Sequence, residues 1–379
     1  MAVSRRTFLV RAAQCALLLA VPPGLVACGG GLTRDDTKKG EGYARLSSAI
    51  GPERAEILWY ASFAPSSHNT QPWMVTIESE NRWVVGSSRE RWLPEVDPQN
   101  RETLLSIGAF VENLVTAAAT FGFRIAVEPV ARTPFDTELV RLELQNAVRR
   151  EYPLERLLER RTLRTGFKSD DIDAEDFSFI VGGSDGFYYY PPSSVQAAWL
   201  DNASIEAVRH QTTRKNVQEE LAAWIRWSDA DARKYRNGLT PESMDITGLA
   251  GWYVRNFYGT GDVLSKDFRK ASVERARKQV AESGGWIVVT SRDDSPRALL
   301  DTGRRFERMF LKAKDRKIAV HPMSQVLEES PWAEKAAASL MLSAKPQLLL
   351  RVGYMRDYPG PVSLRMPVAE TTTLGYGRD

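Results

Sequence analysis

Residues 64–73 read Ala-Pro-Ser-Ser-His-Asn-Thr-Gln-Pro-Trp and join an apolar stretch of helical character to an apolar stretch of strand character. The two prolines hold φ near about −65° and push the residues before them towards extended geometry. We therefore expect a stiff, largely extended loop. Its hydroxyl and carboxamide side chains would offer neutral donors and acceptors in fixed directions, which suits a flat heterocycle. The alternative is an ordered turn whose Ser and Asn side chains cap neighbouring elements.

This stretch resembles the flavin-ring loop of the nitroreductase family, where a Pro-Ser-Ser-x-Asn-x-Gln-Pro-Trp run lies beside the isoalloxazine of FMN. The resemblance implies that the protein binds FMN without covalent attachment. It also implies which residues address the ring, namely Pro65, Ser66, Ser67, Asn69 and Gln71.

An arginine-rich segment, residues 159–167, is the expected partner of this loop. Side chains two residues apart share a face in extended chain, so Arg160, Thr162 and Arg164 would converge on one anion. Two guanidiniums and a hydroxyl make a plausible phosphate clamp. A solvated charge run is an equally good interpretation from the residues alone. The segment also resembles the one that opens a nitroreductase protomer and binds the FMN phosphate.

Ordinary nitroreductases are dimers that bind FMN across the subunit interface. Here the ring loop and the arginine segment each occur once, in opposite halves of one chain, and residues 191–199 only echo the ring loop. The resemblance, closest to the Acg-like branch, implies an α+β, nitroreductase-like fold with two fused sheet-and-helix halves, 51–150 and 151–379. A pseudo-twofold would relate the halves around one composite flavin site, and the protein would act as a monomer that is an internal pseudo-dimer.

Hydrophobic periodicity predicts the main elements. In the first half we expect a helix at 52–63, a hairpin of strands 74–78 and 82–86, a long helix from Asp97-Pro98 to about 121, and strands at 123–130 and 138–145. In the second half we expect a helix at 203–229, a strand at 286–291, a helix from Ser295-Pro296 to about 314 and a strand at 347–354. The order of the last elements resembles the C-terminal half of the family. It implies that Pro322 lies near the ring edge and that Arg365 assists at the phosphate.

Between these elements, residues 230–283 interleave glycines with Trp and Tyr residues. A glycine-hinged aromatic segment can close over a flat cofactor as a lid. An ordinary packed connection fits the composition equally well.

The first 27 residues read as a twin-arginine signal peptide, with Arg5-Arg6 followed by an apolar run too short for a stable membrane span. Residues 25–28, Leu-Val-Ala-Cys, resemble a lipobox, which implies lipidation at Cys28. Residues 28–50 are then expected to be a flexible tether. We expect export by the twin-arginine route and a lipid-anchored position on the periplasmic side, with the outer membrane favoured. Membrane contact would be through this anchor only.

Charge and cysteine usage narrow the classes of function. The formal net charge of +3 comes entirely from Arg5, Arg6 and Arg11 in the leader, so the remaining chain has no overall basic footprint for nucleic acid. The sequence has two cysteines and three histidines, none in a ligand-like spacing, so no metal site is expected. His321, beside a proline, is interpreted as structural rather than catalytic.

Two functions follow from the resemblance. One is an FMN-dependent oxidoreductase that takes electrons from a small-molecule donor and reduces a flat acceptor such as a nitroaromatic or quinone. The other is a flavin-holding protein whose lid shields the ring, with little turnover. Beyond His68, the sequence offers no obvious catalytic acid or base.

Overall fold

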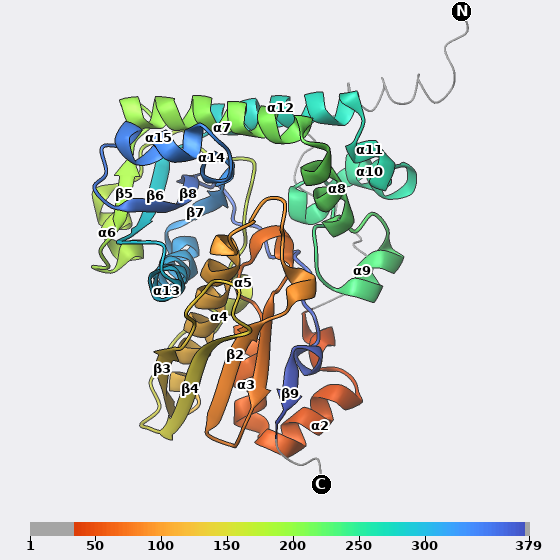
Figure 1. Cartoon of the computed structure of the whole chain (residues 1–379), viewed down its shortest axis with the longest axis vertical. Helices are drawn as coiled ribbons and strands as arrows, with labels where there is room; N and C mark the ends of the chain where they lie inside the picture. The colour runs from red at the N-terminus through yellow and green to blue at the C-terminus, as the bar shows by residue number, and fades with distance from the viewer. Residues whose placement is uncertain (1–33, 376–379) are drawn as a thin grey trace, which may run out of the picture.

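The computed structural model describes residues 34–375. The predicted signal peptide and Cys28 lie outside the described residues. The described residues form two sheets, with helices packed between, below and above them (Figure 1). The α+β architecture of two sheet-and-helix halves is confirmed.

The first sheet has the strand order β3-β4-β2-β1-β9. All its pairs are antiparallel except β1 with β9, which are parallel. The predicted hairpin and the two strands after the long helix are all present. The strands are β1 (Trp73–Ile77), β2 (Arg82–Ser87), β3 (Phe123–Pro129), β4 (Glu138–Asn146) and β9 (Thr372–Leu374).

The second sheet is antiparallel throughout, with the order β5-β6-β8-β7. Its strands are β5 (Phe187–Tyr190), β6 (Trp286–Ser291), β7 (Ile318–Pro322) and β8 (Lys345–Tyr354). The predicted division after residue 150 separates the first four strands from the next four, whereas β9 returns from the C-terminal end of the chain to the first sheet. The two halves are therefore interlocked.

Residues 34–50 differ from the predicted tether, because they form η1 (Asp35–Lys38) and α2 (Glu41–Ile50). Leu46 and Ile50 are buried, one helical turn apart on the same face. The indole Nε1 of Trp59 donates to Thr37 Oγ1 at 2.8 Å, which ties η1 to α3 (Pro52–Ala61). A polar, glycine-containing composition concealed this short amphipathic pattern.

Two long helices, α4 (Arg101–Thr120) and α13 (Pro296–Ala313), form the seam between the halves. A Cβ on Gly108 would lie 2.2 Å from the carbonyl oxygen of Leu300, and a Cβ on Gly303 would lie 2.0 Å from that of Leu105. Each glycine thus faces the carbonyl three residues before the other glycine. This reciprocal contact is a local twofold relation, and it needs glycine because the two backbones touch.

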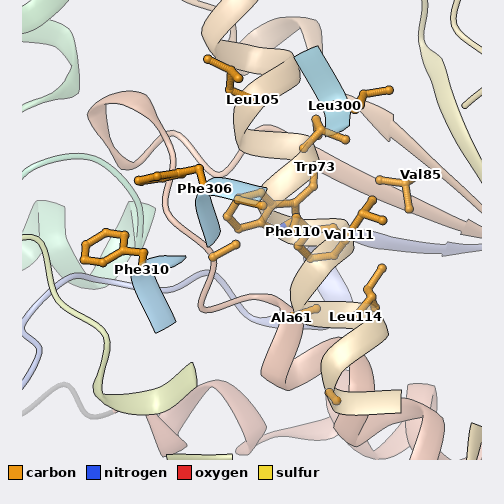
Figure 2. Close-up of a cluster of buried hydrophobic side chains, with 14 of the residues drawn as sticks. Ala61, Trp73, Val85, Leu105, Phe110, Val111, Leu114, Leu300, Phe306 and Phe310 are labelled. Atoms are coloured by element: carbon orange, nitrogen blue, oxygen red, sulfur yellow. The ribbon is translucent and has the colours of Figure 1, made fainter. Parts of the chain in front are cut away.

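The core of the first half is built on the same seam. The Trp73 ring stacks on Phe110 with centroids 4.9 Å apart and an interplanar angle of 14°. Figure 2 shows these rings among aliphatic side chains of α4, with Phe306 and Phe310 of α13 beside them. Among the described residues α4 alone is long and apolar enough to cross a bilayer, and it is enclosed by the protein.

Residues 195–283 are mainly helical. The predicted helix at 203–229 is divided into α7 (Val195–Thr213) and α8 (Lys215–Trp224), because Arg214 is extended. Serine caps start three of the helices: the Oγ atoms of Ser194, Ser228 and Ser265 each accept a backbone N–H at 3.1 Å. The further elements are α9 (Asp229–Tyr235), η4 (Glu242–Met244), α10 (Gly248–Phe257), α11 (Thr260–Val263) and α12 (Lys266–Ala281).

Short elements complete the chain. Figure 1 shows α7 and α12 lying above the second sheet and α8 to α11 to one side. The short elements are η2 (Ser67–Asn69), η3 (Arg89–Arg91), α5 (Glu155–Glu159), α6 (Ala174–Val181), η5 (Lys314–Arg316), α14 (Gln325–Glu328), α15 (Trp332–Ser339) and η6 (Val368–Glu370).

Candidate functional site

A cavity of about 380 Å³ lies where the two halves meet. The ring loop and the start of α4 form one side, and the arginine segment with the end of β7 forms another. Helices α7, α8, α12 and α14, with Leu239 and Met244, contribute most of the remaining wall. The volume lies within the usual range for small-ligand sites.

The ring loop turns sharply in its middle rather than running extended. His68, Asn69 and Gln71 have φ of 48°, 54° and 53°, so three non-glycine residues within four adopt left-handed backbone. Such conformations cost free energy and persist only where surrounding contacts impose them. The flanking prolines restrict the loop's ends, whereas hydrogen bonds fix its centre.

Those hydrogen bonds come from side chains that were predicted to address the ring. Asn69 Nδ2 donates to the carbonyl of Gly238 at 3.1 Å and to that of Leu364 at 3.2 Å. Gln71 Nε2 donates to the carbonyl of Arg236 at 3.1 Å, and its Oε1 accepts from the N–H of Met366 at 3.0 Å. Both side chains bind the loop to distant segments and lie behind the cavity wall.

Arg160 and Arg365 are also buried behind the wall. Arg160 Nη2 donates to the carbonyl of Phe63 at 2.7 Å, and its Nε lies 3.4 Å from Glu307 Oε1. Arg365 donates to the same carbonyl at 3.0 Å and to Asn69 Oδ1 at 3.1 Å. The expected convergence of the arginine segment on one face therefore holds for two of its three residues. Arg160 turns inward because a buried carboxylate and a carbonyl need its donors.

The structure brings six of the ten predicted residues to the cavity wall. They come from both halves and are Pro65, Ser66, Ser67, Thr162, Arg164 and Pro322.

Two guanidiniums give part of the wall a positive charge. Arg164 donates through Nη1 to the carbonyl of Ser243. Burial lowers the pKa of Arg164 and of Arg275 on α12, and the nearby carboxylate of Asp245 opposes both shifts. Within residues 34–375, neither guanidinium has a carboxylate within 4.0 Å. Since guanidinium stays protonated in proteins, the pair is suited to an anion.

Two imidazoles at the cavity are held neutral. Burial lowers the pKa of His68 to about 4, with Glu102 opposing the shift and Arg164 adding to it. Burial also lowers the pKa of His321 well below its usual value, helped by Arg351 and Arg164. Among the described residues no partner contacts His68 Nδ1. This nitrogen is free to accept or donate a hydrogen bond to a ligand.

Buried amide oxygens complete the polar lining. Gln218 is 3% exposed, and its Oε1 contacts no donor among the described residues, nor does that of Gln325. Both side chains line the cavity. Unpaired buried acceptors are costly, so a ligand that carries O–H or N–H groups would be stabilised there.

Several of these groups were missed by the sequence interpretation. The cavity face of α12 consists of Phe268, Ser272, Arg275, Ala276 and Gln279, at helical spacing. That spacing identifies one face of a helix. It does not identify a cavity, because α12 carries charged residues around its whole circumference.

No protein-family model matches this chain. Curated relatives do match. The chain is similar to nitroreductases along most of its length. A probable NAD(P)H nitroreductase of Serratia sp., PigM, is 22% identical over 324 residues, which cover 80% of this chain and 89% of PigM. A Mycobacterium tuberculosis protein provisionally named NAD(P)H nitroreductase acg is 24% identical over 322 residues, which cover 81% of this chain and 91% of the relative.

Among solved structures, the chain is similar to the FMN-dependent nitroreductase NfnB from Mycobacterium smegmatis, solved in complex with NADPH. The match covers 59% of this chain and 97% of the NfnB chain. The sequence identity is 17% and the TM-score is 0.36.

Proposed function

We propose that this protein is an FMN-binding oxidoreductase that reduces a flat acceptor, such as a nitroaromatic or quinone, with electrons from a small-molecule donor. The observation that carries the proposal is the cavity at the seam, which joins the hydroxyls of the ring loop to two guanidiniums from the other half. Similarity to proteins named NAD(P)H nitroreductases over four fifths of the chain supports it.

The groups on the cavity wall fit FMN. Arg164 and Arg275 would hold the phosphate, whose charge their desolvated guanidiniums require. Hydroxyls of Ser66, Ser67 and Thr162 would bind polar edges of the cofactor, with Pro65 and Pro322 in apolar contact.

The unpaired oxygens of Gln218 and Gln325 would accept hydrogen bonds from hydroxyl or N–H groups of the cofactor. Asn69, Gln71, Arg160 and Arg365 would act from behind by fixing the loop and its left-handed centre. When bound, FMN supplies the electron transfer itself, and the protein positions the ring and excludes water.

A flavin-holding protein with little turnover is the second candidate, and one observation favours it. Residues of the predicted lid line the cavity directly, namely Leu239, Met244, Phe268, Ser272, Arg275, Ala276 and Gln279. Hydrogen bonds from Asn69 and Gln71 to residues 236 and 238 fasten this segment to the ring loop. A lid fastened in this way would limit access to the ring.

Anaerobic reduction distinguishes the two candidates. Purified protein is mixed with NADPH, NADH or dithionite while flavin bleaching is followed, in wild type and in a variant with residues 230–283 shortened. Bleaching by a nicotinamide and reoxidation by a nitroaromatic would support the oxidoreductase. Bleaching only by dithionite, with nicotinamide reactivity gained on shortening, would support the holder.

The proposal extends to the cellular location and the oligomeric state of the protein. We propose that the chain is exported folded, with its cofactor loaded beforehand, and is anchored on the periplasmic side through a lipid on Cys28. It would work as a monomer, because α4 and α13 already supply the contact that two subunits would otherwise make.

A further inference from the structure

We propose that Glu102 and Glu328 hold one proton between them at the cavity wall, and that Glu328 gives this proton to the acceptor as it is reduced. The inference rests on the proposed function. It identifies a proton donor that the sequence did not reveal.

The two carboxyl groups come from opposite halves. Glu102 lies in the first turn of α4, and Glu328 ends the short helix α14. Their side chains lie within hydrogen-bond reach of each other, and both line the cavity. Two carboxylates this close in a buried site cannot both be ionised at low cost, so the pair retains a proton.

The neighbours decide which partner carries the proton. Glu102 accepts from Arg101 Nη2 at 3.0 Å and from the hydroxyl of Ser67, and both contacts favour the charged form. Glu328 accepts from Gln211 Nε2 at 2.6 Å. Within the described part of the chain no cation lies within ion-pair distance of Glu328. The proton therefore resides on Glu328.

The surrounding charges reinforce this assignment. Burial raises the pKa of Glu328 well above its usual value, and the charge of Glu102 adds to the shift, while Gln211 and Arg101 oppose it. The pKa of Asp97, which caps α4, is raised to about 7, first by burial and then by the charge of Glu102, so Asp97 is only partly ionised at neutral pH. On the loop His68 is neutral.

The adjacent Glu329 belongs to a separate cluster. It is engaged by His210 Nδ1 at 2.7 Å and by Arg214 Nη1 at 2.8 Å, so these two basic groups do not neutralise Glu328.

The proton balance of the reduction is simple. A quinone that becomes a hydroquinone gains two electrons and two protons. The reduced cofactor would supply both electrons and one of the protons, and would itself be oxidised. The second proton comes from Glu328: its O–H bond breaks as the O–H bond of the product forms. The resulting carboxylate pair, steadied by Arg101, takes up a proton from water before the next turnover.

Infrared spectroscopy of the flavin-loaded full chain tests where the proton resides. At pH 7 the wild type should show a carbonyl band of a protonated carboxyl that shifts in D₂O. Subtracting the spectrum of Glu328→Gln should reveal this band, and subtracting that of the exposed-site control Glu334→Gln should not. Because Glu307 and Asp97 also have a raised pKa, the difference spectrum decides: a difference between wild type and Glu328→Gln that lacks the band would overturn the proposal.

Transient kinetics test the delivery step. Dithionite-reduced protein is mixed with benzoquinone, which needs protons, or with ferricyanide, which takes electrons alone. Glu328→Gln should slow reoxidation by benzoquinone about 10²-fold, because general acid catalysis is commonly worth this much or more. The rate of reoxidation of this variant by benzoquinone should also become dependent on the concentration of buffer acid. Its reoxidation by ferricyanide should be unchanged.

Equal slowing of both acceptors would show a structural role and contradict the delivery step. If the protein binds no flavin, the cofactor proposal fails, whereas the same infrared comparison made on the flavin-free full chain still decides where the proton resides. The two failures are therefore distinguishable.

Discussion

Glu307, in the middle of α13, is completely buried, and Arg160 supplies the cation beside it. Burial raises the pKa of Glu307 to about 7, although Arg160 opposes the shift. A carboxyl whose pKa is higher in the folded than in the unfolded state binds protons more tightly when folded. The stability it contributes is therefore complete below about pH 4.5 and is lost as the pH rises through 7.

This linkage predicts a pH-dependent difference between wild type and Glu307→Gln. Between pH 4.5 and 7 the free energy of unfolding of the wild type should fall by roughly 3 kcal/mol more than that of the variant. Urea titrations across this range measure the difference, and Glu334→Gln, at an exposed site, should retain the wild-type slope. Parallel curves for wild type and Glu307→Gln would contradict the account.

For individual residues, the sequence indicated which ones are important. It was a poorer guide to what their side chains contact. The motif located Asn69 and Gln71, but it did not indicate that their amide groups face away from the cavity. Side-chain direction here depends on left-handed backbone at non-glycine positions, which only tertiary hydrogen bonds enforce. Arg275 and Glu328 had no sequence signal, because they act by facing a cavity formed from both halves.

At the scale of elements, the crossing of α4 and α13 depends on two glycines in reciprocal positions. Gly108→Ala places a methyl group against the carbonyl of Leu300, where it would force the helices apart. We predict a loss of roughly 1–3 kcal/mol or more in the free energy of unfolding. Gly303→Ala should behave alike, and the double variant should lose less than the sum because both act at one contact.

Gly261→Ala is the matched control. It lies in helix α11, where a Cβ would meet no atom within 4 Å, so alanine should be neutral or mildly stabilising. Chemical unfolding of the four variants and the wild type decides the point. Equal stability of Gly108→Ala and wild type would show that the seam is not tightly packed.

Strongly periodic elements were predictable. The hairpin, the long core helix and the strands at 286–291 and 345–354 all lie near their expected positions. The long helix begins at Arg101 rather than beside Pro98, because Asp97 caps it from a preceding turn, accepting from the N–H groups of residues 102 and 103. Residues 230–283 were harder, since their helices are short or, in α12, carry charged residues on most sides, and two of them start at serine caps.

At the scale of the whole molecule, β9 could not have been predicted from local pattern. Its three residues pair with β1 across almost the entire sequence, and a strand this short carries no periodic signal. The division into two sheet-and-helix halves, by contrast, followed from finding the ring loop and the arginine segment once each. The two-half organisation of the chain was therefore easier to infer than the return of β9 to the first sheet, which links the halves.

The proposed anchor makes a prediction about location. Labelling cells with a radioactive fatty acid should mark the wild-type protein but not Cys28→Ala, because Cys28 is the only cysteine left after the proposed cleavage. In fractionation the variant should move to the soluble periplasmic extract. A variant that stays wholly with membranes would contradict anchoring through this residue.

The central claim is one FMN per chain, held between the halves, and flavin stoichiometry tests it most directly. Arg164→Ala with Arg275→Ala removes two cavity-facing cations without exposing Glu307, which changing Arg160 would do. Charge-assisted hydrogen bonds are worth about 1.5–3 kcal/mol each, so FMN affinity should fall roughly 10²- to 10⁴-fold. Arg277→Ala, on the exposed side of the same helix, is the control.

Absorbance and released flavin are measured on purified, folded proteins. The account predicts about one FMN per chain in wild type and in Arg277→Ala, and a colourless double variant. A folded wild type that takes up no FMN, or a double variant that keeps it in full stoichiometry, would contradict the account.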